Sequence, residues 1–134
     1  MAASDWTSKI FSENGLSELY GDPPALDECV LFYAQFDERG VSVTFGFDTR
    51  VLPDNPPADW ADKPYNTVEF FLRFTGVRDL AVAGWNADVR DAHIAMVREE
   101  EAMHVIVQAP QTQLKFAASE VLVTRIRPYL AGAD

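Results

Sequence analysis

The sequence predicts a mainly β fold: an antiparallel sandwich or partly open barrel of seven or eight strands, with a short N-terminal helix. Short apolar runs recur about every ten residues from residue 29 onward, and most alternate apolar with polar residues. A period of two is typical of a half-buried strand, because successive side chains point to opposite faces. Strands at this spacing, separated by turns, are typical of sandwiches and barrels. The length of 134 residues fits one domain, residues 1–134.

A helical segment is expected over residues 4–20. Ser4 or Asp5 can cap its start, and Trp6 lies one turn before Ile10 on the same face. Two consecutive prolines then follow, and each disfavours helical backbone in the residue before it. We expect this segment to cover one face or edge of a sheet.

Residues 29–37 and 41–48 are expected to form a hairpin around a polar turn that ends in Gly40. The second strand alternates cleanly between apolar and polar residues. The first strand begins with the sequence Cys-Val-Leu-Phe, which is apolar on both faces. This pattern indicates that its first half is buried from both sides or covered by the N-terminal segment.

Residues 65–86 form the stretch around which the rest of the chain is organised, and they too are predicted to form a hairpin. Positions 68, 70, 72 and 74 are apolar and most positions between them are polar, with Phe71 as the exception. A tight connection at 75–79 leads to a second strand that ends near Trp85. Because a parallel return needs a dozen or more residues, these two strands should pair antiparallel.

Strands at 91–97 and 102–109 are expected to pair so that the numbers of partner residues sum to 199. The predicted core face then consists of Ile94, Met96, Met103, Val105 and Val107. His93 and His104 become diagonal neighbours on the other face, with Cβ atoms about 7 Å apart. That distance is compatible with a shared metal ion or an acid–base pair. A metal site also needs a third ligand and supporting groups, which this face lacks, so no metal and no cofactor is predicted.

The last segment, residues 113–130, is expected to be extended, with a bulge or break at 117–119. After the break, one face should hold Val121, Val123 and Arg125, and the other Leu122, Thr124 and Ile126. Valine and threonine favour a strand here, although the same residues also suit a helix.

The composition argues against several classes of partner. Acidic residues outnumber basic ones by 21 to 11, for a net charge of −10, whereas nucleic-acid and membrane-surface binders usually carry the opposite sign. Cys29 is the one cysteine, so no intramolecular disulfide is possible, and we expect a buried, inert thiol. No apolar run suits a signal peptide or a transmembrane helix, which predicts a soluble cytoplasmic protein.

Acidic groups beside aromatic residues are the candidate binding residues. They occur in a long proline-rich loop at 49–65 and in the turn that follows Arg98. Trp60 and Tyr65 either pin this loop to the body of the protein or serve as anchors for a partner. Charge can steer a basic protein into contact, and buried aromatics can hold it. We therefore predict partner contacts at Asp54, Asp59, Trp60, Asp62, Glu99, Glu100 and Glu101. No catalytic residue is predicted, because the chain lacks phosphate-binding, dinucleotide-binding and nucleophile motifs.

Residues that are mostly aromatic, glycine or proline occur in a characteristic order: Trp6, Ile10, Leu19-Tyr20-Gly21, Pro23-Pro24, Leu26, Arg39-Gly40, Phe47-Asp48, Pro56-Pro57, Trp60, Asn66, Val68, Phe74, Val77, Asp79-Leu80 and Gly84-Trp85. In this order and spacing the chain resembles the immunity protein 50 family of bacterial polymorphic toxin systems, over nearly its whole length. The resemblance implies a protein that neutralises a cognate toxin. It implies no shared catalytic residues, and we interpret the motif residues as fold-determining.

We therefore predict a non-enzymatic immunity protein, a monomer or weak homo-oligomer, that binds a toxin domain and blocks its active or substrate-binding surface. Two alternatives stay open. A small metal- or histidine-dependent enzyme using His93 and His104 would show bound metal or a pocket around both imidazoles. A structural adaptor subunit would form a persistent oligomer through a large exposed apolar patch.

Overall fold

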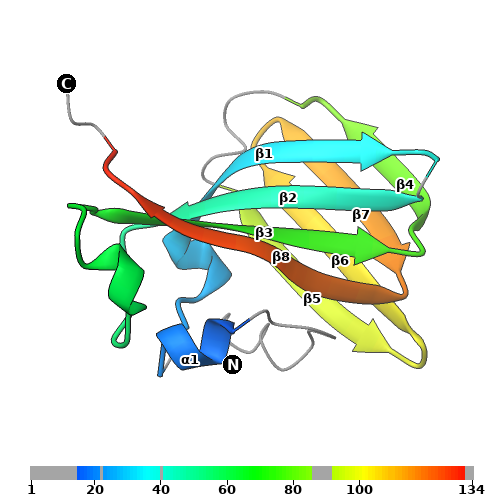
Figure 1. The fold of residues 1–134 in the computed structure, drawn as a ribbon. Coiled ribbons are helices and arrows are strands. Elements are labelled where there is room, and N and C mark those ends of the chain that lie inside the picture. The colour runs from blue at the N-terminus through cyan, green and yellow to red at the C-terminus, as the bar shows by residue number, and fades with distance from the viewer. Residues whose placement is uncertain (1–14, 22, 40, 86–91, 132–134) are drawn as a thin grey trace.

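A computed structural model describes residues 15–21, 23–39, 41–85 and 92–131. The described residues form eight strands: β1 Cys29–Asp37, β2 Ser42–Thr49, β3 Thr67–Thr75, β4 Arg78–Ala83, β5 His93–Glu99, β6 Ala102–Ala109, β7 Thr112–Ala118 and β8 Glu120–Tyr129. All strand pairs are antiparallel, and they build two four-stranded sheets in the orders β1-β2-β3-β8 and β4-β7-β6-β5. The two sheets share no hydrogen-bonded pair of described strands, so they form a sandwich and not a closed barrel (Figure 1).

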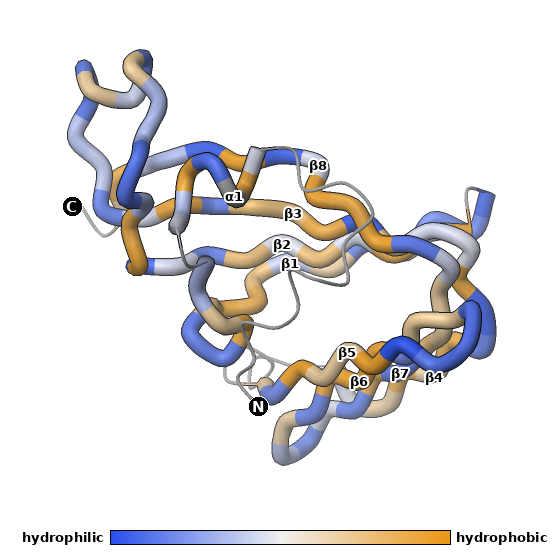
Figure 2. Tube along the Cα trace, turned by 90° about the horizontal axis from the view of Figure 1, so that it is seen from below, coloured by the Kyte–Doolittle hydropathy of each residue, from blue (hydrophilic) through white to orange (hydrophobic). Residues whose placement is uncertain are grey.

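The core lies between the two sheets and is rich in phenylalanine. Figure 2 separates the two layers and shows apolar and polar residues alternating along the strands. Ring centroids within the core lie 5.1 to 6.2 Å apart, mostly in edge-to-face pairs, among Phe45, Phe47, Phe70, Phe74 and Phe116. Such pairs are favoured by the ring quadrupole. The sheet β1-β2-β3-β8, called the front sheet below, contributes four of these rings. Phe116 of the other sheet, called the rear sheet, packs against Phe45 and Phe74.

The predicted hairpin at 65–86 is wrong. β3 pairs with β2 and β8, whereas β4 pairs with β7 in the other sheet. Gly76, with φ of 62°, turns the chain from one layer to the other, and Val77 then donates its N–H to Val41 O at 3.0 Å. A short connection forces two strands to pair antiparallel only if they share a sheet, and here β3 and β4 belong to different sheets.

A second crossing between the layers occurs at Ser119, between β7 and β8. The break predicted at 117–119 is therefore confirmed, and it marks a change of sheet. Ser119 donates its N–H to Thr75 O at 2.8 Å, so the two crossings lie side by side. The close approach requires a residue without a side chain at Gly76, because an added Cβ would lie 2.9 Å from Cβ of Ser119.

The helix expected over 4–20 is not supported. Residues 1–14 lie outside the described residues, and from Gly15 onward there is only a single turn, α1 Leu16–Leu19. Gly15 precedes it in a left-handed conformation, and Tyr20 ends it in extended backbone. This turn still packs on the core, since Leu16 and Tyr20 are each only 2% exposed. Among the described residues, no helix has the length and apolar character to cross a membrane.

The hairpins β1–β2 and β5–β6 form as predicted, but the register of the second is wrong by one step. Its partner numbers sum to 201, as in the pair Val97 and His104, because Glu99 continues the strand and pairs with Ala102. The two-residue turn left over places Glu100 at φ of 57°. The predicted and observed sums differ by two, an even number, so the same residues still face the core. The predicted core face is therefore confirmed: the buried residues include Ile94, Met96, Met103, Val105 and Val107.

Candidate partner-binding surfaces

The predicted acidic turn is exposed at one end of the rear sheet. Glu99, Glu100 and Glu101 all face solvent, and together with Arg78 and His104 they line a cavity of about 720 Å³. Glu99 Oε1 lies 3.5 Å from His104 Nε2. The turn therefore presents three carboxylates close together, and one of them, that of Glu99, lies beside the imidazole of His104.

The predicted acidic loop lies at the opposite end of the molecule (Figure 1). It holds three exposed carboxylates, those of Asp54, Asp59 and Asp62. Trp60, in the 3₁₀ turn η3 Ala58–Trp60, packs partly buried against the core, with its ring centroid 5.6 Å from that of Tyr65 in an edge-to-face pair. Asn55 donates its N–H to Leu19 O at 3.0 Å, and Asp54 accepts the N–H of Gly21 at 3.1 Å. These contacts support the interpretation that the aromatic residues pin the loop.

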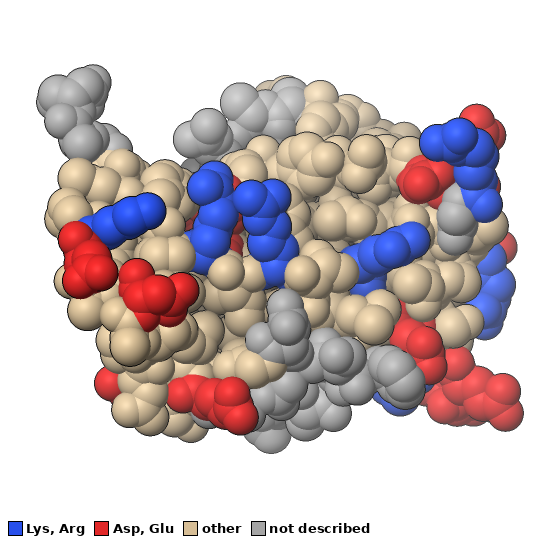
Figure 3. Space-filling view, in the orientation of Figure 1, with Lys and Arg blue, Asp and Glu red and all other residues tan. Residues whose placement is uncertain are grey.

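The seven predicted residues thus form two separate surfaces. Figure 3 shows acidic side chains toward the two ends of the visible face, with basic side chains across the middle. A partner that engaged both acidic groups would have to span the whole front sheet. The structure brings Asp54, Asp59, Trp60 and Asp62 together in one loop and leaves the three glutamates apart from them.

The predicted proximity of His93 and His104 is wrong. In the observed register His93 pairs with Gln108, four residues from His104, so the two imidazoles are about 13 Å apart along the strand. His93 Nδ1 instead lies 3.3 Å from Asp27 Oδ1. In the part of the chain that the structure describes, no three His, Cys, Asp or Glu side chains gather as a metal site would require. The one-step shift in register removes the shared site that the sequence suggested.

The outer face of the front sheet carries a surface that the sequence analysis missed. We call it the aromatic–arginine face and define it by Phe32, Tyr33, Phe71, Arg73, Arg125 and Arg127. One row across the four strands runs Tyr33, Gly46, Phe71 and Arg125 in register. The three rings contact one another with centroids 5.7 to 6.2 Å apart. All three arginines are exposed.

Two bulges create this face. In β1 a register shift between Leu31 and Tyr33 places both Phe32 and Tyr33 outside, where they are 37% and 39% exposed. The predicted cover over both faces of this strand is therefore wrong. In β8 a shift between Val123 and Arg125 reverses the alternation, so Arg125 lies opposite Phe71 and not on the face of Val123. The signal available in the sequence was Phe71, which interrupts the alternation of its strand.

Polar contacts fix the edge of this face next to the arginines. Arg127 Nε donates to Glu69 Oε1 at 2.5 Å, and Tyr129 donates its hydroxyl to Asp48 Oδ2 at 2.7 Å. Burial and this hydrogen bond to a carboxylate raise the pKa of Tyr129 to about 12, so the hydroxyl stays protonated near neutral pH. Side chains from three strands are thereby held in one arrangement.

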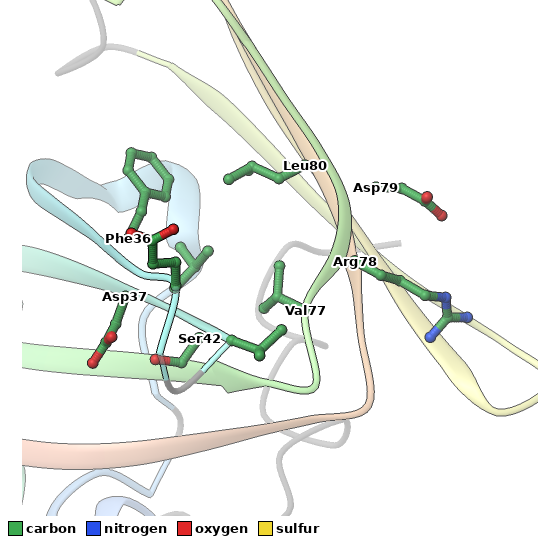
Figure 4. A pocket seen from close by; sticks show the side chains of 10 residues that line it. Phe36, Asp37, Ser42, Val77, Arg78, Asp79 and Leu80 are labelled. Atoms are coloured by element: carbon green, nitrogen blue, oxygen red, sulfur yellow. The ribbon is translucent and has the colours of Figure 1, made fainter.

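An apolar cleft opens where β1 and β4, both edge strands, do not meet. Val82 shares a face with buried Leu114, and Phe36 shares a face with buried Val43, yet Val82 and Phe36 are each 44% exposed. The cavity there has a volume of about 490 Å³. Figure 4 shows Leu80 pointing into this space, with charged side chains of β4 pointing away.

Cys29 behaves as the sequence predicts. Its Sγ lies 3.4 Å from Ala25 O, and the residue is buried. Burial raises the pKa of the thiol to about 12, so the reactive thiolate is scarce near neutral pH.

The comparisons with known proteins agree with the resemblance in the sequence. The family model of immunity protein 50 matches residues 13–129. The chain belongs to the immunity protein 50 family. A search of curated proteins found no match. The matched range includes all eight strands, both acidic surfaces and the whole aromatic–arginine face.

Proposed function

We propose that this chain is an immunity protein that binds a cognate toxin domain directly and neutralises it by covering its active or substrate-binding surface. The observation that carries the proposal is the family match over residues 13–129. The surface chemistry supports binding as the means of neutralisation. Exposed aromatic and arginine side chains, with acidic groups at both ends, are the residue types that hold and steer protein complexes.

The two acidic surfaces are proposed to guide the encounter. The chain carries a net charge of −10, and acidic side chains lie toward both ends of the face seen in Figure 3, from which they can attract a basic toxin. If the toxin acts on nucleic acid, these carboxylates take the place of phosphates on its substrate-binding surface. Within this proposal, Asp54, Asp59 and Asp62 act together with the partly exposed Trp60, and Glu99 to Glu101 act separately.

The test is co-expression with a candidate toxin domain, chosen as one that a gene neighbouring this chain's gene encodes. Growth is scored with and without the chain, and the complex is then isolated by affinity capture of the toxin. The proposal predicts rescue of growth together with a stable complex. Rescue without a complex, or no rescue, would contradict direct binding.

Charge reversal separates the contributions of the two acidic surfaces. A Glu99→Lys/Glu100→Lys/Glu101→Lys variant should slow association with the toxin at low salt by about tenfold, because steering by surface charge acts mainly on the association rate. A matched Asp54→Lys/Asp59→Lys/Asp62→Lys variant changes the net charge equally at the other end. An association rate unchanged in both variants would remove the acidic surfaces from the encounter.

A further inference from the structure

We propose that the aromatic–arginine face is the principal contact surface for a protein partner that presents carboxylates around an apolar centre. This inference rests on the proposed function, because we take the partner to be the toxin domain. It assigns the main contact to the middle of the front sheet and gives the acidic ends only a steering role.

The three rings of the aromatic–arginine face are already packed together in the free protein. Gly46 lies beneath the three rings, and a Cβ added there would lie 2.8 Å from Phe71 Cε2 and 2.9 Å from Phe32 Cζ. The rings therefore pack against bare backbone and against one another, in tilted and edge-to-face pairs. A partner would find these side chains ordered, so that little further conformational entropy would be lost on binding.

The exposed apolar side chains on this face lie next to one another. On β1 the outward side chains of Val30, Phe32 and Tyr33 are 37% to 39% exposed. Phe71 joins them from β3, across Gly46. Isolated exposed apolar residues are common on protein surfaces, but a contiguous patch rimmed by polar groups indicates an interaction site. Aromatic residues and arginine are also the types most enriched at the energetic centre of interfaces.

The charge of this face also favours a carboxylate-bearing partner. Arg73 and Arg125 are exposed on this face, and the structure shows no ion pair for either among the residues it describes. Arg127 is held by Glu69 at its side. Although the chain as a whole has a net charge of −10, these arginines make this face locally positive. They are therefore complementary to carboxylates on the partner.

The same observations favour a protein over a nucleic acid or a second copy of this chain. Single-stranded nucleic acids stack on open ring faces in a positively charged groove, but here the rings turn edges toward each other and both ends of the sheet are acidic. Two copies that met through this face would bring two sets of three arginines into one interface, and these like charges would repel one another. A carboxylate-bearing protein surface meets neither obstacle.

The test compares two double variants with equal changes in charge. Arg73→Glu/Arg125→Glu alters the aromatic–arginine face. Arg39→Glu/Lys115→Glu is the matched control, because Arg39 lies in the β1–β2 turn and Lys115 on the rear sheet, both exposed. Circular dichroism and thermal melting confirm that both variants fold, and affinity for the purified toxin domain is measured by calorimetry. We expect the dissociation constant to rise by about 100-fold for the face variant and by less than about threefold for the control.

Each other outcome has a distinct meaning. If the unmodified chain binds the toxin and the face variant binds equally well, the inference is refuted while the proposed function stands. If the unmodified chain does not bind, the proposed function fails, and the inference fails with it. Binding of a single-stranded oligonucleotide longer than about 16 nucleotides, or a dimer in sedimentation, overturns the assignment to a protein partner if Arg73→Glu/Arg125→Glu abolishes it.

Discussion

The point where the chain twice crosses between its sheets should be unusually sensitive to one methyl group. Gly76 has φ of 62°, and an added Cβ would lie 2.9 Å from Cβ of Ser119 and closer still to its hydroxyl. The left-handed backbone costs an alanine about 1 kcal/mol. Overpacking against the second crossing adds about 2 kcal/mol. We therefore expect Gly76→Ala to lower the free energy of unfolding by about 3 kcal/mol, and the melting temperature by roughly 10 °C.

A control within the chain separates these two contributions. Gly15 is also left-handed, with φ of 83°, but among the described residues the nearest atom to its added Cβ would be Glu18 Oε1 at 3.6 Å. Gly15→Ala should therefore lose only the backbone part, about 1 kcal/mol. Urea unfolding followed by circular dichroism measures both variants, and Gly76→Ala/Ser119→Gly should recover part of the loss. Equal destabilisation by Gly76→Ala and Gly15→Ala would refute the contact between the crossings.

Three further predictions concern buried and surface groups. The folded-state pKa of Cys29 is raised above its ordinary value of 9.0 to about 12, so its contribution to stability is complete below pH 9 and is lost as pH rises toward 12. Urea unfolding should show the excess decline, relative to Cys29→Ala, as about 1.4 kcal/mol per pH unit; parallel pH profiles would contradict it. Arg127→Met leaves the nearly buried carboxylate of Glu69 without its partner and should lower the free energy of unfolding by about 1–2 kcal/mol. The loss is no larger because Arg127 is half exposed and solvent screens the pair. A double-mutant cycle with Glu69→Gln that shows no coupling would contradict this. Gly46→Ala should displace the ring of Phe71 and weaken toxin binding by about tenfold, and calorimetry that shows unchanged affinity would count against a preformed platform.

Much of the strand content could be predicted because it depends on local alternation. The core faces of β2, β3, β5 and β6 follow from a period of two in the sequence. Whether a residue in these strands faces the core can be inferred from that residue and its immediate neighbours. Pairing between strands depends on distant partners and could not be predicted in the same way. The connection at Gly76 is as short as a hairpin turn, yet β4 pairs with β7 of the other sheet and not with β3.

Register failed where the turn has no marker in the sequence. Arg98-Glu99-Glu100-Glu101 contains none of the glycine, proline or asparagine residues that usually locate a two-residue turn. The turn lies one residue later than expected, which preserves the core face but separates His93 from His104. A shift too small to alter the fold was enough to remove a candidate site.

The candidate surfaces were predictable only in part. Exposure of the acidic residues follows from their charge and their position in a loop and a turn. The aromatic–arginine face required the order β1-β2-β3-β8, which brings Arg125 from the end of the chain beside Phe71. It also required two bulges, each of which reverses the side-chain alternation in one strand. The sequence shows neither bulge, because an inserted residue looks like any other until its partner strand is known.

The most direct test of the account is a titration of toxin activity against increasing amounts of this chain. Direct binding that covers the toxin's working surface predicts inhibition that is complete at one equivalent of chain, with a midpoint that matches the dissociation constant from calorimetry. Complete inhibition by far less than one equivalent would contradict the account, because one copy would then be inactivating many toxin molecules as an enzyme does.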